Sequence, residues 1–99
     1  MSGLIVPYED ARPRVDDTVY LAPGSAVVGD VEIGAESSLW PGAVLRGDEA
    51  GVRVGERSNI QDRCVVHVEF GTPTIIGSGV SVGHAAVLHG CILEDGCLI

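Results

Sequence analysis

The feature that most constrains this chain is a six-residue period of aliphatic residues. A second series of small or apolar residues lies four positions after the anchors. Three hexads make one triangular coil, and neighbouring coils stack as parallel strands, whereas a helix or a hairpin needs a different period. The sequence therefore predicts an all-β fold, a parallel β-helix. The anchors are Leu21, Val27, Ile33, Leu39, Leu45, Val54, Ile60, Val66, Ile76, Val82 and Leu88, and the second series is Ser25, Val31, Ser37, Ala43, Ser58, Cys64, Val80 and Ala86.

Glycine supports this interpretation. The 99 residues include 14 glycines and only one Trp, two Tyr and one Phe, which is typical of a glycine-punctuated β chain. Glycine directly follows four anchors, at positions 34, 55, 77 and 83, and we expect the backbone to turn corners there with an unusual φ. The length permits one domain. We expect an extended lead-in over residues 1–14 and the β-helix over residues 15–99.

Two insertions interrupt the hexads. Three extra residues lie between Leu45 and Val54, and four lie between Val66 and Ile76. We interpret them as loops at residues 47–51 and 69–73, and loops on a rigid scaffold are where binding groups concentrate. After Leu88 the register shortens.

The insertions determine which polar residues stack. Three hexads and the second insertion together separate His67 from His89, so the two histidines are one coil apart in the same column. The same calculation with the first insertion adds Arg46 to their column. Three hexads and the second insertion also separate Asp62 from His84, so these two residues stack in another column, one face away.

A single chain does not bring His84 to the other two histidines. If three prisms pack about a threefold axis, the column of one chain meets the Asp62 and His84 column of the next, and three imidazoles converge. Three histidines with an open fourth position are the ligands of a catalytic zinc. Gln61 lies where an amide orients a metal-bound water. The alternative is that the three histidines are ordinary surface residues. In that case Arg46 and Asp62 form an ion pair that only sets the register of the trimer.

Composition excludes several partners. Six Lys+Arg stand against 14 Asp+Glu, with a net charge of -8, so we expect no nucleic acid partner. No apolar run approaches the roughly 20 residues that cross a bilayer, so we expect no membrane association. Cys64, Cys91 and Cys97 match no zinc motif and are interpreted as reduced thiols in a cytoplasmic protein.

Four segments resemble the γ-class carbonic anhydrases and their hexapeptide-repeat relatives. They are APGSAVVGDVEIG (22–34), SLWPGAVLRGD (38–48), NIQDRCVVH (59–67) and VGHAAVLHGC (82–91). The resemblance implies a left-handed β-helix and a homotrimer that binds zinc, or iron or cobalt, through His67, His84 and His89. Periodicity alone does not give the hand.

The resemblance also implies roles for other residues. Arg46 and Asp62 correspond to a pair across the subunit boundary, and Gln61 to the contact with metal-bound water. Asp48 and Asn59 match supporting positions, and Glu49 matches a functional glutamate. Relatives have a longer acidic loop after the first histidine, more coils and a C-terminal helix. We therefore expect a chain that lacks this helix, and trimers that meet end to end or a helix from another chain as the cover of the last coil.

The expected function is zinc-hydroxide hydration of carbon dioxide to bicarbonate at trimer interfaces, with Glu49 as proton acceptor. Two alternatives remain open: an inactive or weakly active metal-binding scaffold, and a transferase or thioesterase acting on coenzyme A thioesters. The second alternative needs a basic groove, and the chain contains no lysine.

Overall fold

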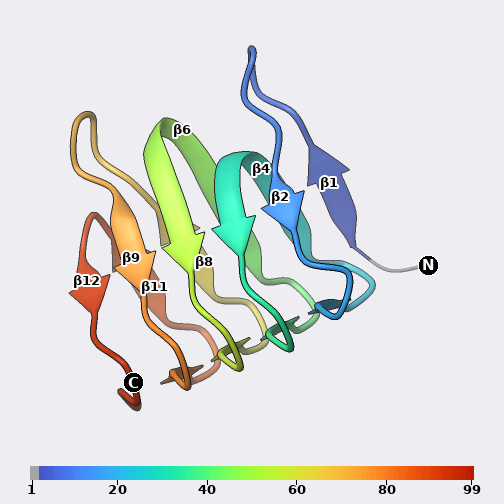
Figure 1. Cartoon of the computed structure of the whole chain (residues 1–99), viewed down its shortest axis with the longest axis vertical. Coiled ribbons are helices and arrows are strands. Elements are labelled where there is room, and N and C mark those ends of the chain that lie inside the picture. Colours follow the sequence, from blue (N-terminus) through green and yellow to red (C-terminus); the bar gives the residue numbers. More distant parts are fainter. Residues whose placement is uncertain (1–2) are drawn as a thin grey trace.

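The chain folds as a parallel β-solenoid of about four turns. The computed structural model describes residues 3–99, and that part of the chain contains strands and turns but no helix. Figure 1 shows the coils stacked side by side from the blue N-terminal coil to the red C-terminal coil. The solenoid is a left-handed β-helix, so the predicted all-β fold is confirmed.

Three faces run along the solenoid. The first contains β1 (Leu4–Val6), the first parts of β4 (Ala26–Ile33) and β6 (Val44–Val54), β8 (Val65–His67) and β11 (Val87–His89). The second contains β2 (Arg14–Val15), the second parts of β4 and β6, β9 (Thr74–Ile76) and β12 (Ile92–Leu93). The third contains β3 (Tyr20–Leu21), β5 (Ser38–Leu39), β7 (Asn59–Ile60) and β10 (Ser81–Val82).

Parallel pairing sets the register of each coil on the next. Val27 pairs with Leu45, Leu45 with Val66, and Val66 with Leu88. The first of these steps is three hexads long, and the next two are longer by the lengths of the first and second insertions, so both insertions are confirmed. Ile75 pairs with Ile92, a step one position shorter than three hexads, which confirms the shorter register near the end.

The core is a stack of inward side chains. Every predicted anchor from Leu21 to Leu88 is buried, and nearly all of the second series is buried with them. Because the same positions repeat in each coil, aliphatic residues contact their equivalents above and below. This continuous apolar column supplies the main driving force for folding.

The two insertions take different forms. The first is not a separate loop, because residues 47–51 remain within β6, which bends outward while its pairing with β4 shifts between Gly29 and Val31. The second is a loop closed by an antiparallel bridge between Glu69 and Thr72. A third turn, closed by Tyr8 and Ala11, was not expected. In Figure 1 these projections lie along the upper edge of the solenoid.

The expected lead-in contributes to the first coil. Leu4–Val6 pairs with the first part of β4, and β2 begins at Arg14. The domain division at residue 15 stays a prediction.

The expectation of an unusual φ at the four glycines after anchors was wrong. Left-handed backbone instead recurs in two columns of corner residues, at positions 24, 42, 63 and 85 and at positions 36, 57, 79 and 96, and it also occurs at positions 9, 29, 71 and 90. The glycines after anchors are required for space. A Cβ on Gly34 would lie 2.8 Å from the carbonyl oxygen of Gly55, and a Cβ on Gly55 would lie 2.8 Å from the carbonyl carbon of Gly77. Successive coils therefore approach too closely there for any side chain.

Buried serines join three coils at the same corner as these glycines. The Ser37 hydroxyl donates to the Gly55 carbonyl (2.8 Å) and accepts the N–H of Ser58 (3.1 Å). The Ser58 hydroxyl donates to the Gly77 carbonyl (2.7 Å) and accepts the N–H of Val80 (3.0 Å). Each hydroxyl thus satisfies backbone groups that no water reaches.

We predict that Ser58→Ala lowers the free energy of unfolding by about 1–3 kcal/mol, because it leaves buried backbone groups without a partner. Urea unfolding followed by circular dichroism measures this change. The matched control is Ser38→Ala, whose hydroxyl accepts only an exposed bond from Trp40 and whose loss should change stability by less than about 0.5 kcal/mol. Equal effects in the two variants would contradict the prediction.

Candidate functional site

Two histidines lie side by side on the first face. His67 at the end of β8 pairs in register with His89 at the end of β11, and their ring centroids are 5.3 Å apart. The pairing of Leu45 with Val66 places Arg46 in the same column, one coil earlier. The predicted stacking of these three residues is confirmed.

Each histidine is held by a carboxylate from the preceding coil. The Nε2–H of His67 donates to Oδ1 of Asp48 (2.8 Å), and the Nε2–H of His89 donates to Oε1 of Glu69 (2.6 Å). Asp48 follows Arg46 by two positions, and Glu69 follows His67 by two. Sequence reasoning did not select Glu69 as a site residue. The sequence signal for Glu69 is that it follows His67 by two positions, as Asp48 follows Arg46.

Asp48 is the most enclosed acid of this group. Its side chain is 10 % exposed, and it contacts the guanidinium of Arg46 as well as His67. Burial alone would raise the pKa of Asp48. The hydrogen bonds from His67 and from the Glu49 N–H, together with the charge of Arg46, outweigh burial and lower the pKa. Asp48 is therefore an anion at neutral pH, placed between two cationic or donor groups.

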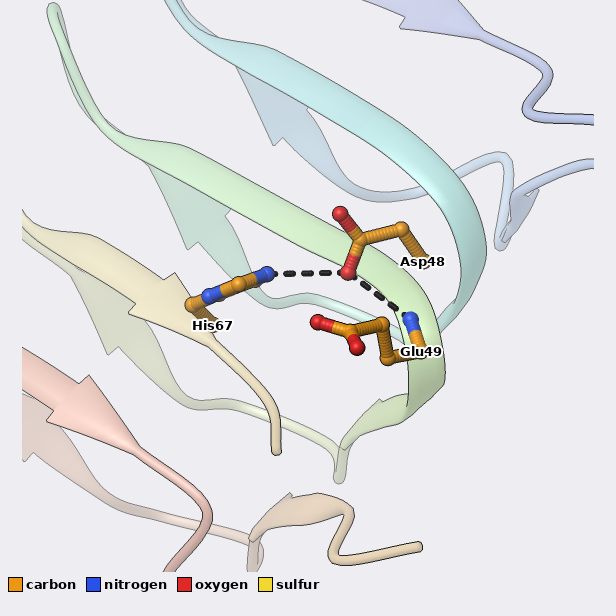
Figure 2. Close-up of side chains that lie close together, drawn as sticks. All are labelled: Asp48, Glu49 and His67. Atoms are coloured by element: carbon orange, nitrogen blue, oxygen red, sulfur yellow. Dashed lines mark hydrogen bonds and ion pairs between the residues drawn. The ribbon is translucent and has the colours of Figure 1, made fainter. Parts of the chain in front are cut away.

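Glu49 completes a compact group of three potential metal ligands. One ligand atom from each of Asp48, Glu49 and His67 lies within 4.8 Å of the other two. Figure 2 shows the Glu49 carboxylate reaching from the bend in β6 toward the His67 ring, below the bond between His67 and Asp48. Asp48 and Glu49 both come from the first insertion.

An acidic hollow of about 320 Å³ adjoins this group. Its walls are the turn at residues 8–11, the bend at residues 47–50 and Asp30, so they include five carboxylates. Asp30 is paired with two arginines, since Arg53 and Arg14 approach it at 3.0 and 3.1 Å. The bond from Arg53 is the largest cause of a lowered Asp30 pKa, which partial burial opposes and Arg14 supports.

The other predicted site residues lie on the third face and in the corner that follows it. Asn59 and Ile60 pair with Ser81 and Val82, and the N–H of Ala85 donates to the carbonyl of Asp62. Asp62 and His84 therefore occupy equivalent places in successive coils, as predicted. His84 is exposed.

Gln61 is held by a chain of side-chain bonds. Its amide nitrogen donates to Oδ1 of Asn59 (2.9 Å), and the Asn59 amide donates to the Ser81 hydroxyl (2.9 Å). This bond uses one of the two N–H groups of the Gln61 amide, so Gln61 presents Oε1 and its second N–H to a further partner. A hollow of about 430 Å³ lies here, lined by Ser38, Trp40, Asn59, Gln61 and Asp62. Trp40 is held against Tyr20, with ring centroids 5.2 Å apart.

The predicted site residues thus form two groups. The first group, on the first face and its corner, is Arg46, Asp48, Glu49, His67 and His89. The second group, on the third face and the corner that follows it, is Asn59, Gln61, Asp62 and His84. One chain does not bring the groups together, as the sequence predicted. Arg46 contacts Asp48 of its own chain, and its expected pairing with Asp62 across a boundary stays a prediction.

Comparison with known proteins bears on this arrangement. The chain is 53% identical over 85 residues to a probable carbonic anhydrase from Methanocaldococcus jannaschii, covering 86% of this chain and 54% of that protein. It is 48% identical over 96 residues to gamma carbonic anhydrase 2, mitochondrial, from Arabidopsis thaliana, covering 91% of this chain and 34% of the relative. The crystal structure of a hexapeptide transferase family protein from Anaplasma phagocytophilum superimposes with a TM-score of 0.86 at 45% identity, covering 90% of this chain and 52% of that one.

The chain is a γ-carbonic-anhydrase-like hexapeptide-repeat protein. No protein-family model matches it. The chain spans between a third and just over half of the length of these two carbonic anhydrase relatives. In the described part of this hexapeptide-repeat chain, no helix is both long and apolar enough to cross a membrane.

We predict that Asp30→Asn lowers stability at pH 7 by less than about 1 kcal/mol, because Asp30 and both arginines are substantially exposed. The folded-state pKa lies below the usual value of 3.8, so the carboxylate stabilises the fold above that pH. Its contribution should disappear as the pH falls below 3.8 through the folded-state pKa. Urea unfolding of both proteins at pH 7, 5 and 2.5 checks this, and an undiminished difference at pH 2.5 would contradict it.

Proposed function

We propose that this chain is a γ-type carbonic anhydrase subunit that hydrates carbon dioxide to bicarbonate at the interfaces of a homotrimer. The observation that carries the proposal is the division of the candidate residues between two faces. Two imidazoles stack on the first face, and the third lies on another face beside Gln61 and Asp62. Closed cyclic packing of identical chains brings two different faces of neighbouring chains together, and in the proposed trimer these are the first face of one chain and the third face of the next.

The side chains present fit a zinc ion, with iron or cobalt as alternatives. Imidazole nitrogens are favoured ligands of zinc, and three of them leave a fourth position open. The carboxylates that hold His67 and His89 are the kind of partner that orients metal-binding imidazoles. When bound, such an ion acts as a Lewis acid that lowers the pKa of water toward about 7, so that the water is nucleophilic at neutral pH.

Other residues have separate tasks in this proposal. Gln61 is fixed through Asn59 and uses its Oε1 to orient the attacking water from the neighbouring chain. Glu49 is an exposed carboxylate beside His67 and accepts the released proton. Arg46 exchanges its bond to Asp48 for one to the neighbour's equivalent of Asp62, which sets the register of the two chains. A cytoplasmic location and end-to-end stacking of trimers stay predictions.

A mixing experiment tests whether the zinc site is shared between chains. His84→Ala alone, and a chain carrying both His67→Ala and His89→Ala, should each bind no zinc at this site and show no carbon dioxide hydration. Co-expressed in equal amounts, they should regain about a quarter of the wild-type zinc and activity, because random trimers then contain intact interfaces.

The controls separate the outcomes. Zinc is measured by elemental mass spectrometry and hydration by stopped-flow pH change, and light scattering verifies the trimer. Asp17→Asn, a substitution of an exposed residue outside both hollows, should leave both readouts unchanged. No recovery in mixed trimers would refute a shared site, and zinc binding without hydration would favour the inactive scaffold.

We also predict that Gln61→Ala lowers turnover by roughly 10–100-fold while zinc content stays at the wild-type level, because the attacking water loses its orientation. Asn59→Ala should show a smaller loss, since Gln61 remains but loses its anchor. Stopped-flow hydration with parallel metal analysis checks both variants. Unchanged turnover in Gln61→Ala would remove this residue from the mechanism.

A further inference from the structure

We propose that Asp48, Glu49 and His67 form a second divalent-cation site that lies within one chain. The set contains two carboxylates and one imidazole from β6 and β8. It needs neither His84 nor His89 and no neighbouring chain. The proposal therefore does not rest on the proposed function.

The spacing of the ligand atoms suits a small divalent ion. Nε2 of His67 lies 2.8 Å from Oδ1 of Asp48. Two ligands at right angles around an ion with bonds of about 2.1 Å are about 3 Å apart. On binding, the neutral imidazole changes tautomer, so that its proton moves from Nε2 to Nδ1 through solvent. The imidazole and the carboxylate then turn from hydrogen-bonding each other to facing the ion. The Glu49 carboxylate reaches the same space from below (Figure 2).

Two of the three ligands are already oriented. Arg46 holds Oδ2 of Asp48, and the N–H of Glu49 donates to Oδ1 (2.8 Å). The side chains of Asp48 and His67 are 10 % and 19 % exposed, so packing restricts both. Glu49 is exposed and completes the set from solvent. Little conformational freedom is therefore lost when a cation binds.

The adjoining hollow explains how a cation reaches these ligands. Asp48 and Glu49 form part of its wall, and Glu9 and Asp10 face them from the first coil. A concave surface lined by carboxylates concentrates cations. The net charge of -8 adds to this effect.

The ligand types select the ion. Two carboxylates and one imidazole favour Mn²⁺, Fe²⁺ or Co²⁺ with water in the remaining octahedral positions. Three imidazoles in a tetrahedral site instead favour zinc. The two sites share His67, so one chain holds one of the two ions at a time, and the sites differ in coordination number and in every other ligand.

The test is a titration of the metal-free chain with Mn²⁺, in which the electron paramagnetic resonance signal of free Mn²⁺ measures binding. We expect about one Mn²⁺ per chain for the wild type and for His84→Ala. Asp48→Asn and Glu49→Gln should each weaken binding by about tenfold or more. Because Glu49 is exposed, Glu49→Gln remains informative if Asp48→Asn fails to fold.

A matched control removes two acids elsewhere. Asp17 and Glu56 are exposed and lie outside the hollow, so a chain with Asp17→Asn and Glu56→Gln should bind Mn²⁺ within twofold of the wild type. If this control weakened Mn²⁺ binding as much as Asp48→Asn or Glu49→Gln does, the weakening would come from the loss of overall negative charge, and the proposal would be overturned. Loss of Mn²⁺ in His84→Ala, or unchanged binding in both Asp48→Asn and Glu49→Gln, would also overturn it. His84→Ala lacks the three-histidine site but keeps Asp48, Glu49 and His67. Its Mn²⁺ binding therefore tests this proposal even if the proposed zinc site proves wrong.

Discussion

Parallel hydrogen bonding between successive coils is the interaction on which the rest of this structure depends. It places each residue beside its equivalent in the next coil, so inward aliphatic side chains form one continuous core. The same pairing brings His67 beside His89 although a complete coil of chain separates them. A shift of one residue in one coil would turn the inward side chains outward and separate the histidines. Core packing therefore also determines the geometry of the candidate site.

The corner between the first and second faces concentrates the acidic chemistry. Extra residues are tolerated there because they project outward without disturbing the core, and the bend in β6 and the loop after β8 both occur at this corner. These projections supply the carboxylates that contact His67 and His89. Arg14, Arg46 and Arg53 bind neighbouring acids and offset part of their repulsion. Asp48 lies where these contacts meet, which is why it is both enclosed and ionised.

Much of this arrangement could be predicted from the residues. The hexad period predicts the coils, and counting the insertions predicts the columns of His67 with His89 and of Asp62 with His84. The bonds of Asp48 and Glu69 could not be predicted in the same way, because they depend on how an outward bend directs a side chain. The predicted backbone conformation at the corners was also wrong. Glycine after an anchor was interpreted as backbone freedom, whereas Gly34 and Gly55 are needed because adjacent coils nearly touch.

By itself, the sequence determined the length of each coil and which side chains face inward, because hydrophobic burial in a solenoid depends only on a periodic pattern. That pattern also determined that His84 lies on a different face from His67. Only the tertiary structure decided that Asp48 holds the imidazole of His67 and that Glu69 holds the imidazole of His89. It also decided that Asp48, Glu49 and His67 converge beside an acidic hollow. Side-chain direction at a bend follows from local backbone geometry and close packing, and neither is encoded in a six-residue period.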